Sequence, residues 1–253
     1  MKVVTIALNT YRESIRDKVL YGLVLFSIIF IGASRILKPL TIGEELKVTK
    51  DMGLASISFF GLLIAVFIGT RLLYEEIEKK TIYTIISKPL KRWQFLLGKY
   101  IGLLLVILTV VIIMTLWIYL VLWLTTRTFD VTLLLGIFYI FLELMVITAI
   151  SLFFSTFSTP IMSGLITFML YFTGHLTRDI LIFAELTKSR IVTIISHIIY
   201  FILPNLSNFN IKGEIVHKVP LETAFLLYSL SYGILYTIFL LLLSVIIFQK
   251  RDF

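Results

Sequence analysis

Long apolar stretches alternate with short charged ones along most of the chain. A stretch of about twenty apolar residues is long enough to cross the hydrocarbon core of a membrane as a helix. The pattern predicts six such helices, at residues 19–37, 53–73, 100–124, 131–154, 161–176 and 224–248. The fifth stretch is short for a perpendicular crossing. We therefore expect an all-α membrane protein whose residues 1–253 form one membrane domain.

Two further segments lie outside these spans. In residues 1–18, Val4, Leu8 and Tyr11 follow helical spacing and the basic residues lie off that stripe. This pattern is typical of an amphipathic helix at the membrane surface, and a polar beginning of the first span is the alternative. Residues 177–223 contain an apolar piece, Ile191–Leu203, that is too short to span. We expect a re-entrant segment in this extracytoplasmic region, because a seventh crossing would move the C-terminus to the other side.

Composition excludes several classes of protein. Hydrophobic residues make up 59% of the chain and charged residues 15%, with a mean hydropathy of +1.02. Soluble domains carry about 25% charged residues, so a soluble fold is excluded. The chain has no cysteine and no His-Glu-x-x-His spacing, which argues against disulfides and a metal site. The net charge of +8 is not arranged for nucleic acid. It suits lipid headgroups.

The positions of the basic residues predict the topology. With the N-terminus inside and six crossings, thirteen Lys and Arg residues lie on the cytoplasmic side and five in the short outer loops. The remaining five lie in the long 177–223 region, which has less influence on orientation. We therefore expect both termini to be cytoplasmic, in a multi-pass protein of the cell (inner) membrane.

The segment Arg71–Gly102 is the longest strongly charged part of the chain, and two predicted spans flank it. Glu75 and Glu76 each precede a lysine by four residues, which favours a helix that continues beyond the membrane. An apolar patch and then a helix break follow: Ile82, Ile85 and Ile86, then Lys88 and Pro89. A short helix with an apolar tip between two spans suits a groove on a soluble partner. A solvated loop is the alternative.

From Glu75 to Gly102, the sequence EEIEKKTIYTIISKPLKRWQFLLGKYIG resembles the cytoplasmic segment of type 2 ABC export permeases. The opening ALNTYRESIRDKVLYGL, the later segment LPNLSNFNIKGEIVHKVPLE and the end QKRDF are similar to the branch of that family that contains the NosY permease. The resemblance covers most of the chain. It leaves the substrate open, because the family transports several chemical classes.

The resemblance implies a permease subunit that forms half of a membrane dimer, expected to be a homodimer, with two cytoplasmic ABC ATPase subunits. It identifies residues 75–89 as the coupling helix. The matching residues are Glu75, Glu76, Glu78, Lys79, Thr81, Ser87, Lys88 and Pro89, and the apolar patch adds Ile82 and Ile85. A periplasmic or extracellular accessory protein is a further candidate partner.

The chain has no Gly-x-x-x-x-Gly-Lys-Ser/Thr motif, since Gly98-Lys99 is followed by Tyr100. It therefore cannot hold nucleotide phosphates in a P-loop. We expect no enzymatic activity and no cofactor in this chain, with ATP and Mg²⁺ bound by the partner ATPase.

Glu143 lies near the middle of the fourth predicted span. A carboxyl group in hydrocarbon is unfavourable and should face other helices or a cavity. It either lines a translocation path or forms a structural hydrogen bond to a neighbouring helix. His175, near the outer end of the fifth span, is the second candidate for the path, and a satisfied structural histidine is the alternative. An ATPase-independent ion channel or proton-coupled carrier that uses Glu143 is the alternative function.

Overall fold

The computed structural model describes residues 2–36, 44–78, 91–127, 129–187 and 190–250. Its elements, in chain order, are α1 (Lys2–Ile15), α2 (Lys18–Ala33), α3 (Glu45–Glu78), α5 (Arg92–Thr126), α6 (Thr132–Ser155), α7 (Pro160–Thr187), α8 (Arg190–Ile202), η2 (Leu206–Phe209), α9 (Lys212–Val216) and α10 (Thr223–Lys250). All elements in these ranges are helical, so the expected all-α class is confirmed.

Four helices in the described part of the chain are long and apolar enough to cross a membrane, namely α3, α5, α6 and α10. They correspond to the second, third, fourth and sixth predicted spans. The helix α3 begins at Glu45 rather than Gly53, and α5 begins at Arg92 rather than Tyr100. Charged residues continue both helices beyond the apolar stretch, so the apolar pattern marks the membrane-embedded part and not the helix ends.

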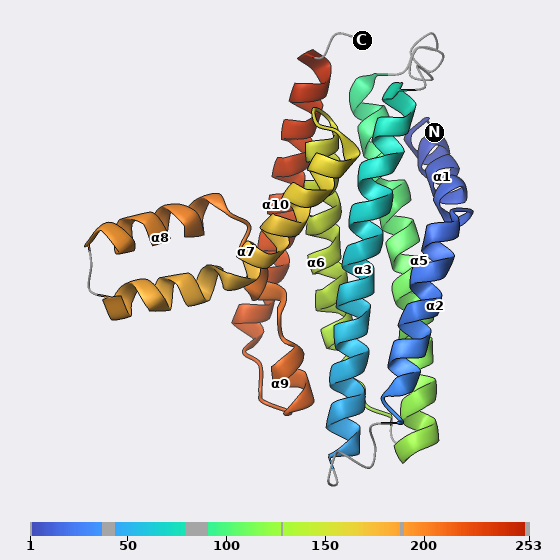
Figure 1. Ribbon diagram of the computed structural model, residues 1–253, viewed down its shortest axis with the longest axis vertical. Helices are drawn as coiled ribbons and strands as arrows, with labels where there is room; N and C mark the ends of the chain where they lie inside the picture. The colour runs from blue at the N-terminus through green and yellow to red at the C-terminus, as the bar shows by residue number, and fades with distance from the viewer. Residues whose placement is uncertain (1, 37–43, 79–90, 128, 188–189, 251–253) are drawn as a thin grey trace.

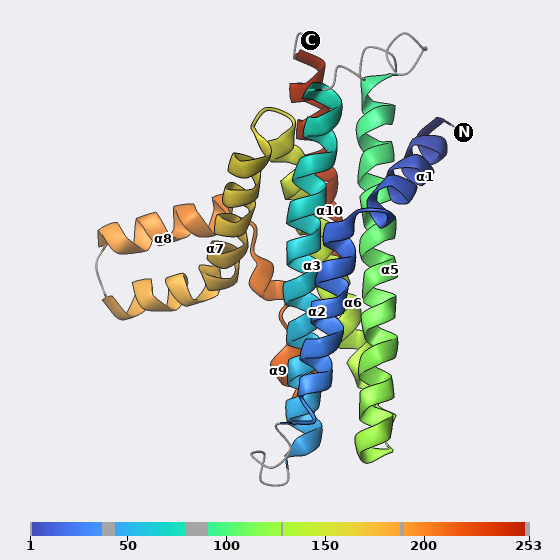
Figure 2. The same cartoon turned by 45° about the vertical axis from the view of Figure 1, so that its right-hand side comes forward.

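The first and fifth predicted spans do not correspond to any of these four helices. The helix α2 has 16 residues, fewer than the roughly twenty of a perpendicular crossing. The fifth span is the first part of α7, which continues to Thr187. In Figures 1 and 2, α7 leaves the bundle part-way along and forms with α8 a hairpin that projects sideways. The proposed re-entrant piece Ile191–Leu203 falls on α8, and the six-span count stays a prediction.

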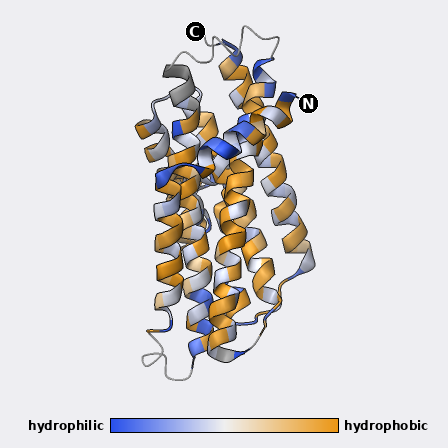
Figure 3. Ribbon diagram, turned by 90° about the vertical axis from the view of Figure 1, so that its right-hand side faces the viewer, coloured by the Kyte–Doolittle hydropathy of each residue, from blue (hydrophilic) through white to orange (hydrophobic). Residues whose placement is uncertain are grey.

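The long helices lie side by side along the long axis of the molecule (Figures 1 and 2). The N-terminus, the end of α3, the start of α5 and the end of α10 lie at one end. Apolar residues dominate the middle of the bundle, and hydrophilic residues gather toward its ends (Figure 3). The side of the membrane on which this end of the bundle lies stays a prediction.

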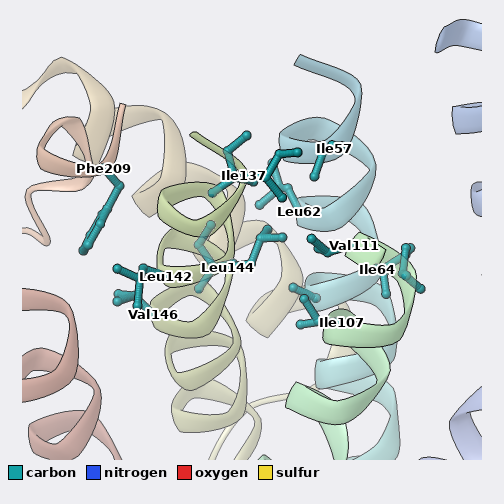
Figure 4. Close-up of a cluster of buried hydrophobic side chains, with 14 of the residues drawn as sticks. Ile57, Leu62, Ile64, Ile107, Val111, Ile137, Leu142, Leu144, Val146 and Phe209 are labelled. Atoms are coloured by element: carbon teal, nitrogen blue, oxygen red, sulfur yellow. The ribbon is translucent and has the colours of Figure 1, made fainter. Parts of the chain in front are cut away.

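The core forms where α3 packs between α5 and α6. Figure 4 shows Ile57 and Leu62 of α3 near Ile137 and Leu144 of α6, and Phe209 beside α6. Small residues allow this close approach. A Cβ at Gly61 would lie 2.4 Å from Leu144 Cδ1, one at Gly69 would lie 2.6 Å from Ser151 Oγ, and one at Gly53 would lie 1.8 Å from Ile118 Cδ1. The glycines of α3 therefore allow close contact with α5 and α6.

A buried ion pair ties the other end of α3 to the turn between α5 and α6. Lys50 of α3 is fully buried, and its Nζ donates to Asp130 Oδ2. Asp130 also caps α6, since its Oδ1 accepts from the backbone nitrogen of Thr132 at 3.0 Å. The α5 helix stops at Arg127, whose φ of 52° ends the helical path. Charge pairing and capping thus fix the α5–α6 turn against α3.

Candidate functional site

The carboxyl group of Glu143 lies at the middle of α6 and is fully buried. His175 of α7 approaches it, with Nε2 at 3.3 Å from Glu143 Oε1. The two candidates for the translocation path, which are distant in sequence, therefore lie together. Within the described residues, neither carboxylate oxygen of Glu143 accepts a hydrogen bond. The expected structural hydrogen bond to a Ser, Thr or Tyr of a neighbouring helix is therefore not formed there.

Three further polar residues complete the Glu143 cluster, which we define as Ser58, Glu143, Tyr171, His175 and Lys212. Lys212 Nζ of α9 donates to Ser58 Oγ of α3 at 2.7 Å, and the lysine lies within electrostatic range of Glu143. Tyr171 stands one helical turn before His175, with ring centroids 4.5 Å apart, and lies near Ser58. The cluster joins α3, α6, α7 and α9.

Sequence reasoning missed Ser58, Tyr171 and Lys212. A serine or tyrosine within an apolar helix is common and carries no signal about its partner. Lys212 offered no clear signal, because it lies in the mixed polar and apolar stretch Ile211–Val216 beside a second charged residue, Glu214. Only the path of the chain after α8 brings Lys212 beside α3.

The cluster supplies compensating charge to a carboxylate in a low-dielectric interior. An isolated buried carboxylate is strongly disfavoured, and a neighbouring cation or a proton is needed to hold it there. Lys212 brings an amino group near the carboxylate, and His175 brings an imidazole ring whose Nε2 lies 3.3 Å from it. The arrangement can therefore bind or pass a proton, and it can hold α9 in place. Among the described residues no cluster is suited to a metal ion.

A second functional region forms at the end of the bundle where α3 ends and α5 begins. The helix α1 packs directly on α5. A Cβ at Gly98 would lie 2.7 Å from Ile6 Cβ, and one at Gly102 would lie 2.6 Å from Thr10 Cβ. The buried face of α1 is its small-residue face, while Val4 and Leu8 are exposed. Residues 2–15 are helical, but Tyr11 of the predicted apolar stripe faces α5, since its hydroxyl lies 3.2 Å from Thr109 Oγ1. The position of this helix at the membrane surface stays a prediction.

The C-terminal end of α10 is fixed to the start of α5 at this same end. Arg92 Nη1 donates to the carbonyl oxygens of Phe248 and Gln249 at 2.8 and 3.0 Å. The rings of Phe95 and Phe248 stack with centroids 6.0 Å apart. These last carbonyls of a helix lack partners within it, so the guanidinium satisfies them and complements the helix dipole. The start of α5 therefore contacts both α1 and α10.

The expected coupling residues lie only partly within the described chain. Glu75, Glu76 and Glu78 belong to the last turn of α3, which continues beyond the predicted span end at Leu73. The expected helix extension is confirmed up to Glu78. Lys79, Thr81, Ile82, Ile85, Ser87, Lys88 and Pro89 lie outside the described residues.

Residues 4–253 match the family model described as ABC-2 family transporter protein. The chain belongs to the ABC-2 transporter family. Searching the curated proteins finds no match. The family match covers nearly the whole chain, so this ABC-2 protein is the membrane-embedded permease subunit of an ABC transporter. Membership also implies that the permease pairs with ABC ATPase subunits.

Proposed function

We propose that this permease is the transmembrane half of an ATP-driven export complex, in which two copies of the chain form the substrate path and two separate ATPase subunits hydrolyse ATP. The residues from Arg71 to Gly102, with the NosY-like pattern around them, are the part on which the ATPase acts. The permease then crosses the cell membrane six times with both termini in the cytoplasm.

The proposal rests on one observation. The helices α3 and α5 border the charged segment, and at this end of the bundle they are held by contacts with other helices. The helix α3 continues to Glu78, and α5 begins at Arg92. The first turns of α5 contact α1 through Gly98 and Gly102, and contact α10 through Arg92. A displacement of the segment between α3 and α5 would therefore reach four helices at once. The ATPase binds this segment with a different free energy in each of its two nucleotide states, and this difference drives the conformational change of the permease.

The test is to replace Glu75, Glu76 and Glu78 together with lysine. We expect the partner ATPase to co-purify less well with the permease and its hydrolysis to lose its dependence on the permease. The matched control is charge reversal of Glu44 and Glu45, at the opposite end of α3. If the triple variant retains the ATPase and its normal response, the assignment of the coupling segment is wrong.

The alternative function is an ion channel or proton-coupled carrier that uses Glu143 without an ATPase. The fully buried Glu143 carboxylate, 3.3 Å from His175, favours it. The purified permease, reconstituted in vesicles without nucleotide, would then move protons or ions across the bilayer. Replacing Glu143 with Gln should abolish that flux while the chain still assembles.

The same substitution tests the role of Glu143 in the export complex. If Glu143 lines the translocation path, Glu143→Gln impairs nucleotide-driven transport but leaves the ATPase bound. Unchanged transport in Glu143→Gln would assign the carboxylate a structural role only.

A further inference from the structure

The chain between α8 and the last helix packs against α3, α6, α7 and α10. Residues 204–216, called the inserted segment here, comprise Pro204, Asn205, η2, a short link and α9. Its buried apolar side chains are at most 3% exposed: Leu206, Phe209, Ile211, Ile215 and Val216. Irregular backbone at membrane depth is stable only where protein surrounds it or where it borders an aqueous cavity.

Three glycines on three different helices receive the inserted segment. A Cβ atom at each glycine would lie between 2.6 and 3.0 Å from an atom of the segment. The contacts are Gly136 of α6 with Ile215, Gly174 of α7 with Pro204, and Gly233 of α10 with Phe209. Each glycine leaves a notch in the surface of its helix, because it carries no side chain. The inserted segment occupies these notches.

Polar contacts hold the segment at each of its ends. At the start, Asn205 Oδ1 accepts from Thr177 Oγ1 at 3.0 Å, and the Asn205 backbone nitrogen donates to the Tyr232 hydroxyl at 2.8 Å. Near the other end, Lys212 Nζ donates to Ser58 Oγ at 2.7 Å. These contacts fix the position of the segment, because its short helical elements have little stability of their own.

A pocket of about 650 Å³ borders the inserted segment, because Glu214 and Ile215 line it together with Lys218, Asp130 and Thr132. Lys212, on the same short helix as Ile215, donates instead to Ser58 of the Glu143 cluster. The inserted segment therefore borders the pocket and also contributes Lys212 to the Glu143 cluster.

We propose that the inserted segment is a movable gate between this pocket and the Glu143 cluster, and that Lys212 is the positioning residue that holds the gate closed. This inference rests on the proposed transport function. Lys212 belongs to the gate itself, and its hydrogen-bond partner Ser58 belongs to the helix α3. A change of charge at the cluster therefore changes directly how firmly the gate is held.

The absence of native cysteine allows the gate to be tested with single cysteines and a hydrophilic maleimide. Leu54 is fully buried and lies behind Ile215, since both approach the Gly136 notch. Leu54→Cys is the reporter of gate opening. Val219→Cys, in the pocket wall and 51% exposed, is the positive control. Met114→Cys, fully buried on α5, reports general loosening of the bundle.

Lys212→Met removes the charge and the hydrogen bond while it keeps an unbranched side chain. In purified permease, we expect this change to accelerate labelling of Leu54→Cys by about tenfold or more, because the hydrogen bond that holds α9 to α3 is lost. Labelling of Val219→Cys and Met114→Cys should not change, and Lys212→Arg should restore slow labelling of Leu54→Cys. An unchanged rate at Leu54→Cys overturns the proposal, and equal acceleration at Met114→Cys overturns it as well.

A second measurement distinguishes a gate that moves during transport from a segment that only stabilises the fold. In the complex with the ATPase, ATP should change the labelling rate of Leu54→Cys, and Lys212→Met should remove that dependence. A rate that is the same with and without ATP overturns the gate. Loss of ATPase binding would instead count against the proposed function, and it leaves the result on the isolated permease unaffected.

Discussion

The buried pair of Lys50 and Asp130 gives the sharpest prediction of stability. Burial by itself raises the pKa of Asp130, but hydrogen bonds from Lys50 and Thr132 and the charge of Lys50 outweigh it and lower the pKa from 3.8 to about 2. One pKa unit corresponds to about 1.4 kcal/mol, so the full shift corresponds to about 2.4 kcal/mol. The side chain of Asp130 is 20% exposed, and screening by solvent reduces this stabilisation to about 1–2 kcal/mol.

The two halves of the pair should not be equivalent. Asp130→Asn leaves the fully buried Lys50 without a countercharge, and we expect it to cost about 3 kcal/mol of unfolding free energy. Lys50→Met leaves a carboxylate that can still reach water, so its cost should be about 1–2 kcal/mol. Thermal unfolding of the purified permease in detergent measures both. A larger loss for Lys50→Met than for Asp130→Asn would contradict this reasoning.

The pH dependence has a definite sign. Because the folded-state pKa of Asp130 is below its ordinary value, its stabilisation is complete above about pH 4 and is lost as the pH falls toward about 2. Asp130→Asn should remove this contribution to acid sensitivity. The matched control is the exposed pair of Lys47 and Glu44, 2.9 Å apart with side chains 41% and 58% exposed. Lys47→Met should cost no more than about 0.5 kcal/mol, and an equal cost for Lys47→Met and Lys50→Met would refute the argument from burial.

Three further substitutions test the helix contacts. Gly102→Ala should destabilise the permease by about 1–3 kcal/mol, since the new Cβ would lie 2.6 Å from Thr10 Cβ. Gly22→Ala is its control, because a Cβ there meets nothing within 4 Å, and it should leave the melting temperature unchanged or higher. Arg92→Lys should raise protease sensitivity at the C-terminal end of α10 by replacing a two-carbonyl contact with a single one. Trp117→Phe should cost about 1 kcal/mol in thermal unfolding, because Trp117 Nε1 donates to a carbonyl of α2 at 2.9 Å.

The pattern of apolar residues predicted the existence and order of the long helices but not the residues at which they begin and end. The helix α3 extends beyond Leu73 because Glu75, Glu76 and Glu78 continue the backbone hydrogen bonding in a polar environment, where hydropathy carries no signal. The close contacts of Gly61 and Gly69 were predictable, since small residues at four-residue multiples favour helix packing. The sequence did not predict which helix would pack against these glycines, because the spacing of small residues is the same for any partner helix.

The region between α7 and α10 shows the limit of sequence reasoning most clearly. The mostly apolar piece Ile191–Leu203 is α8, in a hairpin with the end of α7, and its re-entrant role stays a prediction. The following segment, 204–216, packs against α3, α6, α7 and α10, although it contains Asn205, Gly213 and Lys212 and looks polar and irregular for that place. Its burial depends on notches at Gly136, Gly174 and Gly233, which no local pattern connects to it.

The sequence by itself determined that this protein spans a membrane, carries a charged segment between two long helices, has no P-loop and resembles an ABC permease. Each of these follows from local composition, spacing or motif, which are complete in a short stretch of chain. Only the tertiary structure decided that Glu143 meets His175 and that residues 204–216 pack against α3, α6, α7 and α10. Such contacts join residues on four separate elements, and their energies depend on distance and burial, which are set by packing and not by neighbours in sequence.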